Sequence, residues 1–381
     1  MTRISIPTSL AIPTLLVACG TSESGTGGEG GAGGVDFTAF EWTELNGNAP
    51  WAARAGLHTV ELDGKFYLMG GRTPLDSPIP GASTLWSDVW ISEDEGASWT
   101  QVLESGADGH WAPRAYFQAV TKGDSMYVIG GQDFGIMSNF YNDVWTSQNG
   151  VEWTELTANA GWTPRAGLRA VVFKDEIYVF GGSQFDDDAI IGPGGPSRIY
   201  FNDVWKSADG IDWEQMTDDA PWDPRAGAVV VVKDGYMFLL GGEDGFLCEP
   251  QPDCELPYFN DVWRSQDGAN WELVTDSAGW SPRPGHQCAV VYDNIVCFGG
   301  FGLPENPMDV WVSPDGATWE QVSDSPWNAV DPEEVKYDFE GFAVGDEIFT
   351  FGGDRETFDF EDQTNYLRVD NDVWRYALPT P

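Results

Sequence analysis

The chain has 381 residues, with 61 acidic against 19 basic side chains and a formal net charge of −42. This balance excludes nucleic acid as a partner, because phosphate binding needs clustered Lys and Arg and the sequence has no basic run. The length alone would suit two or three domains, but the internal repeat described below overrides that expectation. We interpret the acidity as a solubility feature in preference to an acidic binding face.

Residues 1–18 have the pattern of a lipoprotein signal peptide. Arg3 supplies the positive charge, and the apolar run from Ile4 to Val17 is shorter than the about 20 residues that span a bilayer. The run ends in Leu16-Val17-Ala18-Cys19, which resembles the lipobox of bacterial lipoproteins, where the cysteine is lipidated. The expected localisation is therefore the bacterial cell envelope, at the outer membrane in a Gram-negative cell. An ordinary secreted protein is the alternative.

Residues 19–36 comprise the predicted lipidated Cys19 and a tether rich in Gly, Ser and Thr. Such a segment cannot bury apolar surface, so we expect a flexible coil with an average span of roughly 20–25 Å. That span would hold the following domain just clear of a membrane surface.

From residue 37 to residue 381 the chain repeats one unit of four short strands, here called a to d. In the copy at residues 161–216, two apolar runs flank a polar turn and stop at Gly181-Gly182, which predicts a hairpin of strands a and b. A variable loop then leads to Asp203-Val-Trp205, and an Asp-Gly turn separates Trp205 from Trp213. This second part predicts a hairpin of strands c and d.

Four features mark each of the six copies. Double glycines stand at Gly70-Gly71, Gly130-Gly131, Gly181-Gly182, Gly241-Gly242, Gly299-Gly300 and Gly352-Gly353. Asp-Val-Trp ends at Trp90, Trp145, Trp205, Trp263, Trp311 and Trp374, and strand d carries Trp42, Trp99, Trp153, Trp213, Trp271 or Trp319. The units open with Trp51, Trp111, Trp162, Trp222, Trp280 or Trp327. We expect the indoles to fill the wedges between blades and the Asp carboxylates to bind backbone N–H groups.

This pattern resembles the kelch family of β-propellers, and one copy keeps the kelch-like form Arg283-Pro-Gly-His286. The turn from Ser92 to Trp99 also resembles the Asp-box of sialidases. The resemblance implies an all-β propeller of six four-stranded antiparallel blades. Residues 38–45 look like a lone strand d, and the last unit stops after strand c, so we expect the N-terminal strand to complete the last blade and close the ring.

One basic residue begins strand a in every blade. These entry residues are Arg54, Arg114, Arg165, Arg225, Arg283 and Lys336. They could form a cationic ring at the channel mouth that binds a carboxylate, a sulfate or an acidic sugar. Alternatively, each could stack on a neighbouring Trp or pair with the Asp of Asp-Val-Trp. The b-to-c loops vary in length and should share a face with the d-to-a connections, where recognition is expected.

Two pairs of cysteines remain after Cys19. Cys248 and Cys254 flank a short loop in an exported chain, which predicts a disulfide. Cys288 and Cys297 lie on paired strands, and a register with 292 opposite 295 places them diagonally. That geometry is poor for a bridge, so two buried thiols are favoured over a disulfide.

The sequence predicts no metal site and no cofactor. His58, His110 and His286 occupy different positions of the repeat and share no ligand spacing. The acidic run from Asp186 to Asp188 could bind Ca²⁺, but a solvated loop is the preferred interpretation. No Ser–His–Asp arrangement or phosphate-binding glycine loop is recognisable.

Two functional hypotheses follow. The first is a non-catalytic, monomeric binding protein, anchored to the membrane by a lipid, which presents its loops to a protein or glycan. The alternative is an exported carbohydrate-active enzyme, since some kelch-like bacterial proteins are sialic-acid mutarotases. A charged channel mouth with a nearby acid would suit proton transfer at an anomeric carbon, but no motif specific to those enzymes is present.

Overall fold

The computed structural model describes residues 34–77, 82–134, 138–185, 198–245, 257–302, 307–328, 336–355 and 367–379. The chain divides into residues 1–35 and a second compact unit, residues 36–381. The predicted lipidation site Cys19, the Cys248–Cys254 pair and the run from Asp186 to Asp188 lie outside the described residues. In the described part of the chain, no helix has the length and hydrophobicity needed to span a bilayer.

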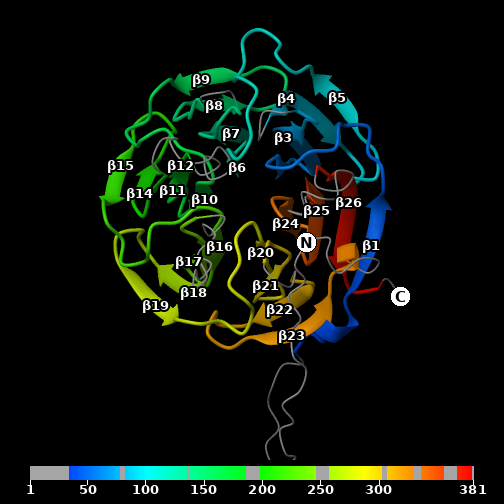
Figure 1. Cartoon of the computed structure of the whole chain (residues 1–381), viewed down its shortest axis with the longest axis vertical. Coiled ribbons are helices and arrows are strands. Elements are labelled where there is room, and N and C mark those ends of the chain that lie inside the picture. Colours follow the sequence, from blue (N-terminus) through cyan, green and yellow to red (C-terminus); the bar gives the residue numbers. More distant parts are fainter. Residues whose placement is uncertain are drawn as a thin grey trace, which may run out of the picture. The chain divides into compact units, whose positions relative to one another are not determined.

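The described residues of this unit form six four-stranded antiparallel sheets arranged as blades around an axis (Figure 1). The innermost strands are β2 (His58–Leu62), β6 (Gln118–Lys122), β10 (Arg169–Phe173), β16 (Val229–Lys233), β20 (Gln287–Val291) and β24 (Glu340–Val344). The second strands are β3 (Lys65–Pro74), β7 (Ser125–Ile129), β11 (Glu176–Phe180), β17 (Tyr236–Glu243), β21 (Asn294–Phe298) and β25 (Glu347–Asp354). The third strands are β4 (Ser83–Ser92), β8 (Val144–Ser147), β14 (Val204–Ser207), β18 (Tyr258–Ser265), β22 (Asp309–Ser313) and β26 (Val369–Ala377).

The outermost strands are β5 (Thr100–Leu103), β9 (Thr154–Thr157), β15 (Glu214–Thr217), β19 (Trp271–Thr275), β23 (Glu320–Asp324) and β1 (Glu41–Asn46). Two 3₁₀ turns, η1 (Phe37–Ala39) and η2 (Pro326–Asn328), and a small ladder of β12 (Ser183–Gln184) with β13 (Ile199–Tyr200) complete the described elements. The predicted all-β propeller of six four-stranded blades is confirmed.

The N-terminal strand closes the ring, as the sequence predicted. β1 pairs antiparallel with β26, with Trp42 opposite Tyr376 and Glu44 opposite Trp374, and the sheet runs β1-β26-β25-β24. The Trp42 indole also lies 5.0 Å, centroid to centroid, from the ring of Trp327. The last blade therefore joins the two ends of the domain.

The double glycines make the joints between successive blades. In each pair the N–H of the second glycine donates to the backbone carbonyl of the basic entry residue of the next blade. Gly71 donates to Arg114 at 2.9 Å, for example, and Gly353 donates to Arg54 at 3.0 Å, which completes the circle. Gly71 has a φ of 101°, and a Cβ built there would lie 2.9 Å from the Ala55 carbonyl oxygen. Only glycine meets both requirements.

A second circle of hydrogen bonds, here called the backbone belt, surrounds the axis. Its members lie two residues after each entry residue, and each N–H donates to the carbonyl of the preceding member at 3.0–3.2 Å. The members are Gly56, Tyr116, Gly167, Gly227, Gly285 and Asp338. All six have positive φ, a conformation that Tyr116 and Asp338 adopt without being glycine.

Tryptophans fill the wedges between blades, as expected. The opening indoles are buried: Trp111, for instance, packs with residues of β2, β3 and β7 in one cluster. Its ring meets the strand-d ring of Trp153 edge to face at 6.0 Å, and four other blades repeat this pairing. Such contacts stabilise the packing beyond their buried area.

The interpretation of Cys288 and Cys297 as thiols was wrong. β20 pairs with β21 so that Val291 opposes Asn294, which leaves Tyr292 and Asp293, both with positive φ, as a two-residue turn. This register sets Cys288 directly opposite Cys297, with their Cα atoms 4.1 Å apart, and the two form a disulfide. The expected register was displaced by one position along each strand, which made the sulfurs look diagonal.

Replacing both cysteines with alanine should lower the free energy of unfolding by about 2.5 kcal/mol, because the bridge joins residues only 9 apart. Urea unfolding with and without reductant measures this difference, and reductant should shift the midpoint of the wild type more than that of the double variant. Two free thiols at these positions in peptide mass spectra of the non-reduced protein would contradict the bridge.

Candidate functional site in the central channel

The six entry residues are buried, none with more than 2% of its surface exposed. Each pairs with the Asp of its own blade's Asp-Val-Trp. Arg225 is typical: Nη1 and Nη2 donate to the two carboxylate oxygens of Asp261 at 2.6 and 2.9 Å, and Nη1 also donates to the Gly241 carbonyl. Its guanidinium lies 3.9 Å from the ring centroid of Phe259. The group is thus neutralised and stacked within one blade.

The other five positions follow the same plan, through Arg54–Asp88, Arg114–Asp143, Arg165–Asp203, Arg283–Asp309 and Lys336–Asp372. The carboxylates have a structural role, but their donors are not the expected backbone N–H groups. They accept from the basic residue and, in five of the six blades, from the indole N–H of the following Trp, as Asp261 does from Trp263 at 2.7 Å. Among the described residues, none of the six basic side chains lines the cavity described next. They occupy the arrangement of the alternative interpretation, with each cation held by its own blade.

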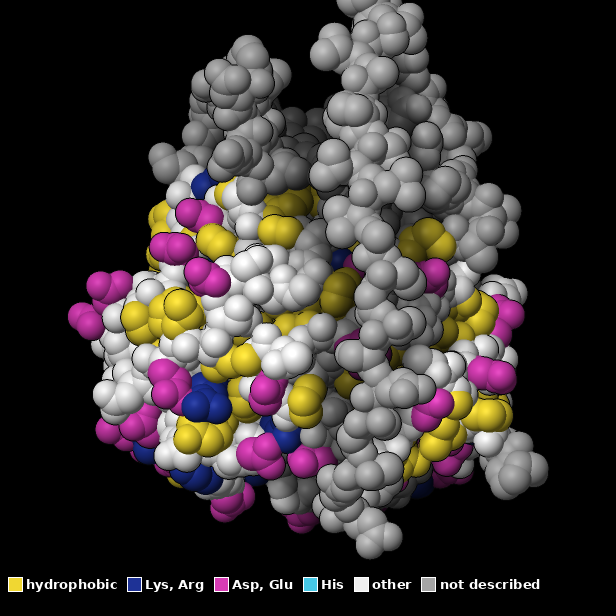
Figure 2. Space-filling view, turned by 90° about the horizontal axis from the view of Figure 1, so that it is seen from below, with side chains coloured by type: hydrophobic (Ala, Val, Ile, Leu, Met, Phe, Trp, Pro, Cys, Tyr) yellow, Lys and Arg dark blue, Asp and Glu magenta, His cyan; other side chains and the backbone are white. Residues whose placement is uncertain are grey.

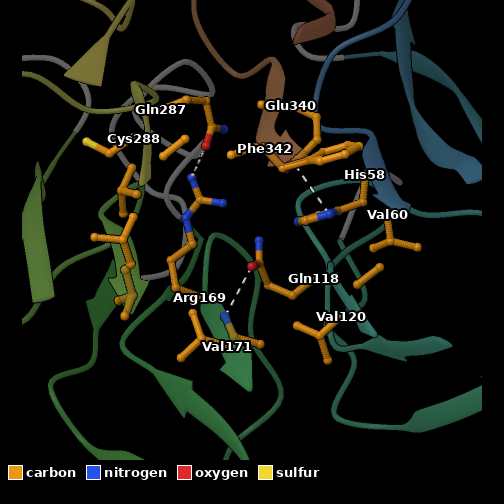
Figure 3. Close-up of a pocket in the computed structure, with 18 of the residues that line it drawn as sticks. His58, Val60, Gln118, Val120, Arg169, Val171, Gln287, Cys288, Glu340 and Phe342 are labelled. Carbon is orange, nitrogen blue, oxygen red and sulfur yellow. Dashed lines mark hydrogen bonds and ion pairs between the residues drawn. The ribbon is translucent and has the colours of Figure 1, made fainter. Parts of the chain in front are cut away.

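A cavity of about 400 Å³ follows the axis between the innermost strands. Its polar end is made by the first residue of each of these strands, four positions after the entry residue. We call this set the channel ring: His58, Gln118, Arg169, Val229, Gln287 and Glu340. Figure 3 shows Arg169 extending between Gln118 and Gln287, with His58 and Glu340 across the channel. Five blades thus contribute a polar side chain to one small space.

The rest of the cavity is mostly apolar, with Thr59, Glu61 and Thr121 as its polar lining residues. Its walls continue along the strands toward the a-to-b turns and carry Val60, Val120, Val171, Val231, Ala289 and Phe342. Val232 near that end is 37% exposed. At the opposite end, the backbone belt and the channel ring enclose a smaller space of about 60 Å³. The cavity therefore has a wide end that is lined mainly by valine and a narrow end where the polar channel ring lies.

Arg169 differs from the entry residues in having no carboxylate at ion-pair distance within the described part of the chain. Its Nε donates to the Ala228 carbonyl at 2.6 Å, and Nη2 donates to Gln287 Oε1 at 3.1 Å. Burial lowers the pKa of the guanidinium, while the more distant charges of Glu340 and Asp338 raise it. Since arginine stays protonated in proteins, the channel contains a cation without a direct counter-ion.

His58 and Glu340 face each other, with 3.3 Å between Nδ1 and Oε2. Burial, aided by the charge of Arg169, lowers the pKa of His58 to about 3. Burial raises the pKa of Glu340 to about 8, against the opposing effects of Arg169 and the Gly341 N–H. At neutral pH the imidazole is uncharged and the carboxyl group is mostly protonated, so Arg169 supplies the net charge of the ring.

Glu340 should make the protein less stable as the pH rises from about 6.5 to about 8. Its folded pKa lies above its unfolded value, so the folded state holds a proton that the unfolded state has already released. The loss should be roughly 2 kcal/mol, and His58 does not contribute because it is neutral in both states above about pH 6.5. Urea unfolding at several pH values measures the slope, which Glu340→Gln should abolish; an unchanged slope in the variant would contradict the assignment.

The channel ring was not predicted from the sequence. Its signal was a polar residue four positions after the basic residue in five of six copies, but the side chains differ from blade to blade and look like unrelated substitutions. Among the described residues, no group of three or more His, Cys, Asp or Glu side chains is placed to hold a metal ion.

Known proteins share the repeat. A profile of the KLHDC2/KLHL20/DRC7 Kelch-repeats domain matches residues 34–182. The flagellar outer-arm dynein alpha chain of Chlamydomonas reinhardtii is 27% identical over 283 residues, covering 70% of this chain and 6% of the dynein. N-(sulfonatooxy)prop-2-enimidothioate sulfolyase of Thlaspi arvense is 28% identical over 108 residues, covering 28% of this chain and 31% of the sulfolyase. The matches therefore span less than two thirds of both of these relatives.

Kelch domain-containing protein 3 of Rattus norvegicus is 25% identical over 291 residues, covering 69% of this chain and 67% of the relative. Among solved structures, YjhT aligns with a TM-score of 0.64 and 15% identity over 86% of this chain and 96% of its own, which is a likeness of fold. Kelch-repeat propellers typically mediate protein interactions. The kelch-repeat profile covers residues 34–182, and the described residues of the whole domain form a six-bladed β-propeller.

Proposed function

We propose that the protein is a non-catalytic binding protein of the bacterial cell envelope. A lipid on Cys19 and the tether that follows hold the propeller at the membrane, and one face presents its loops to a protein or glycan partner. The lipobox-like Leu16-Val17-Ala18-Cys19 and the Gly-rich stretch behind it support the anchor. The predicted monomer is part of this proposal.

The observation that supports a binding role is that the variable loops all leave the propeller on the same side. Single bridges such as Ala55–Arg72 and Ala226–Glu243 join the last part of the second strand, from which the b-to-c loop continues, to the d-to-a connection of the same blade. Both kinds of connection therefore leave the scaffold on one side, here called the loop face, while the a-to-b and c-to-d turns form the turn face. Loops of different length on a rigid repeated frame are a common basis of recognition.

The described surface favours a protein partner over a polyanion. In Figure 2 acidic side chains are spread over the visible face among hydrophobic ones, and few Lys or Arg side chains appear. The chain as a whole carries −42. A partner of opposite charge would be attracted at long range, and a nucleic acid would be repelled.

Site-specific photo-crosslinking in cells tests the loop face. A photoreactive residue at Leu75, which is 46% exposed in a b-to-c loop, is compared with one at Ile211, which is 48% exposed in a c-to-d turn on the turn face. We expect a discrete crosslinked partner from position 75 and none from position 211. Equal crosslinking from both positions, or crosslinking from position 211 alone, would contradict the proposal.

Cys19→Ser tests the anchor. The variant should leave the membrane fraction and appear in the soluble fraction, because a single serine cannot accept the lipid that retains the wild type. Fractionation followed by immunoblotting measures the distribution. Membrane attachment unchanged by the substitution would exclude lipidation at this residue.

A second candidate is an exported carbohydrate-active enzyme such as a sialic-acid mutarotase or epimerase. One observation favours it: a carboxyl group with a pKa of about 8, Glu340, lies beside His58 in an accessible channel, where it could exchange protons near neutral pH. The rate of anomer interconversion of acidic sugars, followed by NMR, should then rise with the wild type and fall with Glu340→Gln. A rate equal to that in buffer would reject this candidate.

A further inference from the structure

We propose that the central channel is a binding site for a small carboxylate with an apolar body. The carboxylate group meets Arg169 in the channel ring, and the apolar body lies along the valine-lined walls. This site is separate from the loop face, and it could be occupied whether or not a partner is bound there.

Arg169 provides the anchor. A guanidinium has five N–H donors, and the contacts to Ala228 and Gln287 engage one donor each on Nε and Nη2. Every entry residue, by comparison, has its own carboxylate within its blade. A buried cation is costly unless an anion pairs with it. A ligand carboxylate can pair with the guanidinium through two parallel hydrogen bonds.

The remaining members of the channel ring define the orientation. Gln118 accepts from the Ala170 N–H at 3.1 Å, and Gln287 donates to the Phe339 carbonyl at 2.6 Å, so both amides are fixed in place. His58 is 6% exposed, and its Nε2 has no hydrogen-bond partner among the described residues. The protonated carboxyl of Glu340 can donate a hydrogen bond to an anion. These groups offer polar contacts around the guanidinium without adding negative charge.

The walls select the rest of the ligand. A volume of about 400 Å³ is within the usual size range of small-molecule sites. Beyond the channel ring, the walls are mainly valine, alanine and Phe342, and the polar lining residues there are Thr59, Glu61 and Thr121. A polyhydroxylated body would lose most of its bonds to water along the valine-rich walls, while an aliphatic or aromatic body gains by leaving water.

The approach to the site is from the turn face. On the loop side, the backbone belt and the channel ring leave only the space of about 60 Å³. On the opposite side the exposed Val232 and the partly exposed Val290 and Phe342 mark the wider end. An amphiphilic anion entering there would place its charged group at the far, polar end.

Titration calorimetry with hexanoate as the probe tests the site, with hexanol and hexylammonium as neutral and cationic counterparts. We expect hexanoate to bind, and Arg169→Gln to weaken it at least tenfold, since hydrogen bonds to charged groups are the strong ones. Arg264→Gln is the matched control, because Arg264 lies at the surface paired with Glu272, and it should bind as the wild type does. Equal binding of hexanol, unchanged affinity in Arg169→Gln, or no binding of hexanoate would each overturn the proposal.

N-acetylneuraminate is a further probe, and it separates the two kinds of carboxylate. Binding of this sugar acid through Arg169 in preference to hexanoate would overturn the apolar body proposed here and would support the enzymatic candidate instead. Stronger binding of hexanoate supports the proposal, whichever way the tests of the loop face turn out.

The pH dependence of hexanoate binding remains decisive if Arg169→Gln does not fold. The charged or titratable groups around Glu340 are His58 on β2, Arg169 on β10 and Asp338 before β24. Glu61 on β2 lines the same cavity farther along the strand, and β20 presents the neutral Gln287. As Glu340 ionises above about pH 8, its charge should compete with the ligand for Arg169 and weaken binding. Glu340→Gln should remove this loss, and an affinity of the wild type that does not change across this range would contradict the site.

Discussion

A chain that starts after Asn46, and so lacks β1, should not form a stable propeller. Without β1, the third strand of the last blade becomes an open edge and the indole of Trp42 no longer packs against Tyr376 and Trp327. The two circles of hydrogen bonds between blades then lose the support of the last blade, which joins the fifth blade to the first. The exposed strand edge also favours aggregation. The loss should equal or exceed the whole stability of a typical domain, about 5–15 kcal/mol.

Urea unfolding followed by tryptophan fluorescence measures this effect. A chain that starts at Gly34 is the matched control, because it keeps η1 and β1, and it should unfold at the midpoint of the longer protein. The milder variant Trp42→Ala should cost about 3–5 kcal/mol by removing one large core side chain. If the chain without β1 unfolded at the same urea concentration as the control, the closure of the ring by the N-terminal strand would be refuted.

Asp203→Ala should destabilise the domain by about 3–5 kcal/mol, because it leaves the guanidinium of the fully buried Arg165 without its partner. Asp203 accepts from both terminal nitrogens of Arg165 and from the Trp205 indole, so a single truncation removes three hydrogen bonds. Replacing both members of the pair with apolar residues should recover much of the loss, since the isolated charge is the costly element.

Glu272→Ala is the control for this prediction, because it breaks an Arg–carboxylate pair at the surface, with Arg264, instead of one in the interior. Exposed pairs of this kind contribute about 0–1 kcal/mol. Equal effects of Asp203→Ala and Glu272→Ala would show that the entry residues do not depend on their carboxylates for stability, and would reopen a ligand-binding role for them.

The fold was predictable because its signals are local and repeated. Each copy of the repeat predicts the same four strands. The last copy lacks strand d and the N-terminal segment is a lone strand d, so closure by residues 38–45 follows from counting strands. The disulfide was not predictable with the same security. Whether Cys288 faces Cys297 depends on the length of the turn between β20 and β21. A shift of the strand register by one position places each side chain opposite a different neighbour.

The candidate site could not be predicted from the sequence for a different reason. His58, Arg169, Gln287 and Glu340 come from four blades and are separated by more than fifty residues each, so only the closed ring brings them together. The entry arginines drew attention because they repeat, and repetition marked a structural role: each is neutralised by Asp in its own blade. Arg169 occurs once at its position, and this lack of repetition distinguishes it from the framework.

The backbone belt has a consequence for how this molecule can change. The width of the channel is set by hydrogen bonds between peptide groups and not by side chains. Each of the six residues of the channel ring can therefore be substituted individually while the backbone belt stays the same. Val229 already illustrates an apolar choice beside five polar ones. The channel ring thus has six positions at which single substitutions could give the channel a new ligand preference without changing the backbone belt.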